Sequence, residues 1–140
     1  MDQERIKSKL NEIDEYLDKL ENIIPENFEI YKTSIRDKLA CERLLQLSIE
    51  NIIDICNILV SKFRVGIPSD EDDVFEKLKQ KNIITKEMKN ILIGMKSVRN
   101  ILVHRYGTID DEKIFENIST QLGDFEKFKK EVLNIIKNKK

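Results

Sequence analysis

The chain has 140 residues, a length that suits one domain with one hydrophobic core, so we expect residues 1–140 to form a single domain. Apolar residues make up 40% and charged residues 36%, which argues against a disordered chain. The net charge of −1 argues against a protein that coats nucleic acid through a general positive field. Glycine (4) and proline (2) are scarce, which favours long helices.

Two cysteines and the start of the chain indicate the compartment. If Cys41 and Cys56 share one helix, they lie ~22 Å apart and cannot form a disulfide within a subunit. We interpret them as buried thiols of a reducing compartment. The chain opens directly into an amphipathic pattern, and no apolar run approaches the ~18 residues that span a membrane. These features predict a cytoplasmic protein without a membrane segment.

The first half of the chain predicts two helices. Apolar residues recur every three or four positions over about 2–22, and Pro25 marks the end of that helix. A longer helix is expected over roughly 31–63. Its apolar set is too wide for one stripe, so we expect it to bury two faces, one in the subunit core and one against a partner.

The second half predicts three more helices. Residues 66–69 form a breaker, and Ser69 or Asp70 can cap a short helix that ends near Gln80. The acidic run 70–73 can favour the positive start of that helix or hold a metal ion. We favour the helix start because no further ligand cluster is visible.

Thr85 is expected to cap a fourth helix that stops at Gly107, and Asp110 to begin a fifth helix that runs to about residue 137, with Gly123 as a point of interruption. No strand-length alternation appears. The pattern therefore predicts an all-α, up-and-down bundle of four to five helices.

The inventory of reactive residues is small. His104 is the only histidine, and the chain has no glycine-rich phosphate loop and no HExxH motif, so we expect no metal and no cofactor. Four polar side chains remain in one apolar segment: Arg99, Asn100, His104 and Tyr106. On a regular helix, Arg99 and Tyr106 differ by ~20° of rotation and Arg99 and His104 by ~140°. Such residues can line a groove between helices or subunits, or they can simply be surface and helix-end residues.

Three segments together resemble a known family. Arg-Asn-x-x-x-His-x-Tyr stands at 99–106, a long helical segment at 42–55, and Gly-Ile-Pro at 66–68 is followed by 75–78 and 82–84. In order and spacing they resemble the HepT-like branch of the HEPN superfamily over nearly the whole chain. Arg105 departs from the pattern, because many relatives carry an acidic or small residue there.

The resemblance implies a homodimeric helical bundle that brings two Arg-x4-His motifs to one cleft. It implies a metal-independent endoribonuclease toxin of a type II-like toxin–antitoxin system, with Arg99 and His104 catalytic and Asn100 supporting them. It also implies a nucleotidyltransferase antitoxin of the MntA type, which adds AMP to Tyr106 and silences the toxin.

The residue types suit that chemistry. The 2'-OH of RNA is a built-in nucleophile, an imidazole can move protons near neutral pH, and a guanidinium matches phosphate oxygens. Two other functions are possible, and the first of them would use the same residues. The chain can be a catalytically silent subunit that presents a nucleotide or substrate to a nucleotidyltransferase, or a dimerisation bundle without site chemistry.

Overall fold

The computed structural model describes residues 2–104 and 110–138, and within them the chain is helical and contains no strand. This confirms the predicted all-α class. The described residues form seven helices, of which α1, α3, α5 and α7 are long: α1 (Asp2–Ile23), α2 (Phe28–Thr33), α3 (Ile35–Lys62), α4 (Glu71–Gln80), α5 (Lys86–Val103), α6 (Asp111–Thr120) and α7 (Gly123–Asn138).

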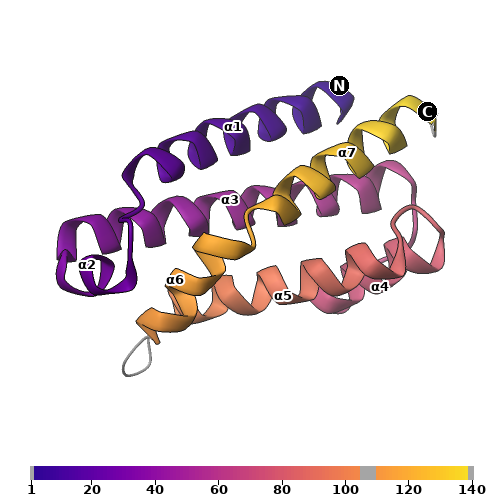
Figure 1. Ribbon diagram of the computed structural model, residues 1–140. Coiled ribbons are helices and arrows are strands. Elements are labelled where there is room, and N and C mark those ends of the chain that lie inside the picture. The colour runs from indigo at the N-terminus through magenta and orange to yellow at the C-terminus, as the bar shows by residue number, and fades with distance from the viewer. Residues whose placement is uncertain (1, 105–109, 139–140) are drawn as a thin grey trace.

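The long helices run back and forth along the molecule (Figure 1). Helices α1 and α3 form the most extensive helix pair of the described chain, and α3 also contacts α2, α4 and α5. Both termini lie at one end of the bundle. The C-terminal end of α5 lies at the opposite end, near α2 and the start of α6 (Figure 1).

The predicted helix over 31–63 is wrong at its start, because Ser34 breaks it into α2 and α3. Ser34 has extended backbone angles (φ −95°, ψ 91°), and its hydroxyl accepts the N–H of Asp37 at 3.4 Å, as the N-cap of α3. Its own N–H donates to the carbonyl of Ile30 and closes α2. A serine side chain competes for backbone hydrogen bonds in this way, so a turn fits better here than helix interior.

The last predicted helix is interrupted where Gly123 indicated. Helix α6 ends at Thr120, Gln121 follows as its C-cap, and α7 begins at Gly123. The predicted start of α4 is also confirmed, since Asp70 is its N-cap and accepts the N–H of Asp73 at 2.8 Å. Gly66 has a φ of +112°, which an L side chain rarely adopts, so the breaker needs a glycine there.

Helix α3 forms the centre of the core. Its apolar set is wide because it packs against several helices of the same subunit, and Cys41 and Cys56 are both buried on it as free thiols, as predicted. By length and composition α3 is apolar enough to cross a membrane, which corrects the expectation that no segment is. However, 61% of its apolar window is buried inside the bundle, so its composition suits a core helix.

Helix α2 is joined to α6 by aromatic packing. The ring of Phe115 lies 5.1 Å from that of Tyr31 and 6.0 Å from that of Phe28, measured between centroids. This contact places the start of α6 beside α2. The aromatic contact between α2 and α6 therefore lies at the same end of the bundle as the C-terminal end of α5 (Figure 1).

Candidate active site at the end of helix α5

Helix α5 carries the polar segment at its C-terminal end. Thr85 caps its start as predicted and accepts the N–H of Met88 at 3.0 Å. Met88, Leu92, Met95, Val98 and Leu102 form its buried stripe. Arg99 follows Val98 directly, so its backbone is firmly placed by the core.

The Arg99 guanidinium is held on one side by two protein groups. Its Nε donates to the side-chain oxygen of Asn100 at 3.0 Å, and its Nη2 donates to Oε1 of Glu71 on α4. The Arg99 side chain is only 16% exposed. Arg99 is therefore not a free surface residue but a fixed cation between α5 and α4.

Helix α4 runs antiparallel to α5 and pairs three of its carboxylates with α5 cations. Asp72 lies 2.8 Å from Lys96 and Glu76 lies 2.6 Å from Lys89, measured from carboxylate oxygen to Nζ. The hydrogen bond from Lys89 lowers the pKa of the Glu76 carboxyl. The pair between Glu71 and Arg99 is the one nearest the C-terminal end of α5.

The acidic run at 70–73 is used for helix capping and ion pairing. Asp73 accepts the N–H of Ser69 at 2.9 Å and pairs with Lys77 at 3.4 Å. The Ser69 N–H, aided by Lys77, lowers the pKa of the Asp73 carboxyl. Among residues 2–104 and 110–138 no three His, Cys, Asp or Glu side chains gather as a metal site would require. The capping and pairing contacts of Asp70 and Asp73 support the helix-start interpretation of the run.

His104 lies at the point where α5 ends. It is the C-cap residue (φ −97°, ψ 72°), and its backbone N–H donates to the carbonyl of Asn100 at 2.9 Å. The residue is exposed. An exposed histidine thus stands five positions beyond the partly buried Arg99, at the helix terminus.

Two expectations about the end of α5 need correction or remain open. The helix ends at Val103 and does not continue to Gly107, because the ψ of His104 departs from helical values. The ~20° relation between Arg99 and Tyr106 assumed a continuous helix over both residues, and it is not tested here because Tyr106 is not described. Tyr106, Arg105 and Gly107 lie outside the described residues.

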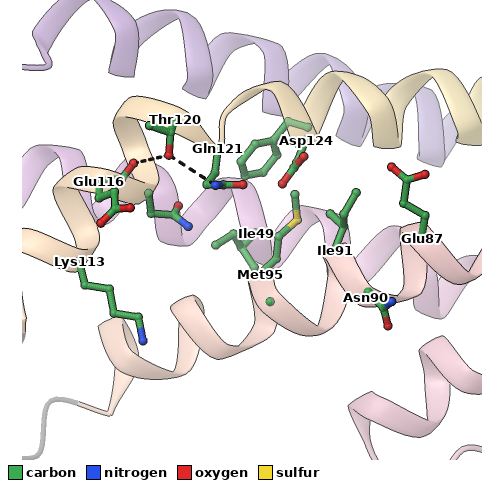
Figure 2. A pocket seen from close by; sticks show the side chains of 13 residues that line it. Ile49, Glu87, Asn90, Ile91, Met95, Lys113, Glu116, Thr120, Gln121 and Asp124 are labelled. Carbon is green, nitrogen blue, oxygen red and sulfur yellow. Dashed lines mark hydrogen bonds between the residues drawn. The ribbon is translucent and has the colours of Figure 1, made fainter.

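A cavity of about 570 Å³ lies between α5, α6 and α7 and does not include the motif. Figure 2 shows its polar rim, where the Thr120 hydroxyl donates to the Glu116 carbonyl at 2.7 Å and accepts from Gln121 at 3.4 Å. Ile49, Ile91 and Met95 line its floor. Arg99, Asn100 and His104 are not among its lining residues. The polar segment thus lies outside this groove, and its Arg99 contacts α4.

Sequence reasoning missed the role of Glu71. It treated Glu71 only as one of several acids that favour a helix start, whereas its carboxylate reaches across to Arg99, 28 positions away. The ion pair between Lys38 and Asp111, which joins α3 to α6, was also missed. No periodicity marks such pairs, because they depend on how two helices pack.

The chain belongs to the family described as "Ribonuclease HepT-like", whose model matches residues 13–132. A "tRNA nuclease HepT" from Aphanizomenon flos-aquae is 32% identical over 120 residues, covering 86% of this chain and 82% of that protein. An "mRNA nuclease HepT" from Shewanella oneidensis is 36% identical over 84 residues, covering 60% of this chain and 63% of that protein.

A solved structure has the same fold. It is described as a tri-AMPylated HEPN toxin from Shewanella oneidensis in complex with an MNT antitoxin. The similarity has a TM-score of 0.82 at 27% sequence identity and covers 95% of this chain and 96% of the toxin chain. These findings confirm the resemblance stated from the sequence and place the chain in a family of nucleases.

Proposed function

We propose that this chain is a toxin that cleaves RNA without a metal ion and that a nucleotidyltransferase antitoxin silences it. The observation that carries the proposal is that a fixed guanidinium, on Arg99, and an exposed histidine, His104, both lie at the C-terminal end of one helix. The family supports the class of reaction, and the relatives are named as tRNA and mRNA nucleases.

The proposed reaction uses groups that RNA itself supplies. His104 takes the proton of a ribose 2'-OH, and the 2'-oxygen attacks the adjacent phosphorus. The bond from phosphorus to the 5'-oxygen breaks, and a second imidazole, acting as an acid, protonates that oxygen. The products are a 2',3'-cyclic phosphate and a 5'-hydroxyl. Arg99 binds the phosphate oxygens, on which negative charge increases in the transition state.

The need for both a base and an acid argues for a homodimer. Each chain has one histidine, so two copies at one cleft supply the pair. The wide apolar set of the long helix no longer argues for a dimer, because α3 buries most of its apolar surface inside the subunit. Other apolar side chains are exposed, among them Ile35 and Leu39 at the start of α3 and Val103 at the end of α5. Sedimentation that finds only monomer at micromolar concentration would remove the two-histidine mechanism.

Control by AMP transfer to Tyr106 is the second part of the proposal. The related toxin is described as tri-AMPylated and bound to an MNT antitoxin. Tyr106 follows His104 by two positions, so an AMP group there adds bulk and negative charge close to the catalytic imidazole along the chain. Such a group would compete with RNA phosphate for Arg99 or His104. We expect a nucleotidyltransferase of the same kind as partner.

The decisive experiment uses the purified, unmodified protein with single-stranded RNA in EDTA. We expect cleavage to persist and the products to carry 2',3'-cyclic phosphate ends, detected by mass spectrometry. Cleavage that depends on added metal, or that leaves 3'-hydroxyl ends, would contradict the mechanism. Tight RNA binding without any cleavage would instead support the silent, substrate-presenting subunit.

A further inference from the structure

We propose that Glu71 is a positioning residue of this site, which holds Arg99 by one side of its guanidinium and leaves the other side for phosphate. The inference rests on the proposed function and names a residue outside the Arg-x4-His-x-Tyr motif. It starts from two contacts. Arg99 Nε donates to Asn100 at 3.0 Å, and Arg99 Nη2 donates to Glu71.

Both contacts use the same side of the guanidinium. Within residues 2–104 and 110–138, Nη1 of Arg99 makes no hydrogen bond, so its two N–H donors are not used by the protein. A guanidinium cannot deprotonate in proteins, and therefore it stays cationic beside the carboxylate. A phosphate oxygen can thus bind at Nη1 while Glu71 and Asn100 remain in place.

Glu71 is itself fixed by the local structure. It is the first residue of α4, directly after the N-cap Asp70, and its side chain is 37% exposed. The pair Glu76–Lys89 holds α4 alongside α5. A long, flexible arginine side chain loses rotational freedom when it binds substrate, and a preformed anchor reduces that loss. Glu71 therefore acts through Arg99 and does not need to touch RNA.

The same contact admits the opposite role, in which Glu71 competes with RNA for Arg99 and restrains activity. The two roles differ in the sign of one measurement. If Glu71 positions Arg99, its removal slows cleavage. If Glu71 competes, its removal speeds cleavage or tightens RNA binding. The unbonded Nη1 and the second anchor at Asn100 favour positioning.

The test compares Glu71→Ala, Glu71→Gln and the matched control Asp72→Ala in the full-length protein, with one single-stranded RNA. Asp72 also pairs with an α5 cation, Lys96, but does not contact Arg99. We expect Glu71→Ala to lower kcat by roughly 10- to 100-fold with a smaller change in KM, because a misplaced catalytic group costs rate. Glu71→Gln keeps an oxygen that accepts a hydrogen bond and should recover most of kcat. Asp72→Ala should stay within about twofold of the wild type.

A second measurement reports on Arg99 without RNA. In ¹⁵N-labelled protein, the guanidinium N–H signals of Arg99, assigned by their loss in Arg99→Lys, should be protected from solvent exchange. Glu71→Ala should abolish the protection while circular dichroism stays unchanged, and Glu71→Gln should retain it. Activity of Glu71→Ala equal to or above wild type, or unchanged protection, would overturn the inference. If the wild type cleaves no RNA, the proposed function fails, and the exchange measurement still decides whether Glu71 holds Arg99.

Discussion

Lys38 and Asp111 form an ion pair that joins the start of α3 to the start of α6. The Lys38 Nζ lies 3.1 Å from Asp111 Oδ2, although the two residues are 73 positions apart. Their side chains are 22% and 24% exposed, so water screens the pair only in part. The pair therefore fixes the first turn of α6 against α3.

Loss of this ion pair should lower the stability of the fold. We expect Lys38→Met to reduce the free energy of unfolding by about 1–2 kcal/mol, between the values typical of surface and buried pairs, because Asp111 is left without its partner. Urea denaturation of Lys38→Met, Asp111→Asn and the double variant measures the coupling. A coupling energy near zero would show that the pair contributes nothing to stability.

Arg99 and His104 should be essential for cleavage but not for folding. We expect His104→Ala to lower kcat by about 10²- to 10⁴-fold, as loss of an acid–base group does, and Arg99→Ala by about 10²- to 10³-fold. The cap hydrogen bond of His104 comes from its backbone N–H, so alanine preserves it. Single-turnover RNA cleavage and thermal unfolding provide the two measurements.

Ser97→Ala is the matched control for these variants. Ser97 is an exposed polar residue of the same helix, and its hydroxyl donates to the carbonyl of Ile93, one turn earlier in that helix, at 3.1 Å. The Ser97→Ala variant should cleave RNA as fast as the wild type does. A large loss of helicity in Arg99→Ala or His104→Ala would indicate that the motif has a structural role instead.

Tyr106 should be the residue that receives AMP. When the chain is expressed together with its nucleotidyltransferase partner, we expect its intact mass to rise by whole AMP units. Tyr106→Phe should abolish the increase, and Tyr16→Phe should not. The third tyrosine, Tyr31, is completely buried, so its hydroxyl cannot enter a partner's active site. Modification that persists in Tyr106→Phe would refute the assignment.

Neither cysteine should react readily in the folded protein. Burial, followed by the charges of Asp37 and Glu42, raises the pKa of Cys41 to about 11, and burial also raises the pKa of Cys56. The thiolate is the reactive form, so at pH 8 only about one Cys41 thiol in a thousand is reactive. Ellman's reagent should therefore label the native protein slowly and both thiols rapidly in denaturant. Rapid labelling of one thiol in the native protein would show that α3 opens or that this thiol is not fully buried.

Much of the fold was predictable because it depends on local patterns. Residues 2–23 form a helix close to the predicted bounds, and Asp70 and Thr85 cap α4 and α5 as expected. Apolar spacing and capping side chains act within a few residues, so the sequence displays them directly. The break at Ser34 was missed because a serine inside an apolar-periodic segment is compatible with helix as well as with a cap.

The helical class and the buried thiols could be predicted from the sequence alone. The family could be predicted as well, because the motif at 99–106 stands in the right order and spacing with the segments at 42–55 and 66–84. Only the tertiary structure decided where α5 ends and which groups face its polar residues. Glu71 meets Arg99, and Lys38 meets Asp111, through the packing of helices that are distant in the chain. Such contacts depend on the relative placement of whole helices, which is set by the summed burial of many apolar side chains and not by any short motif.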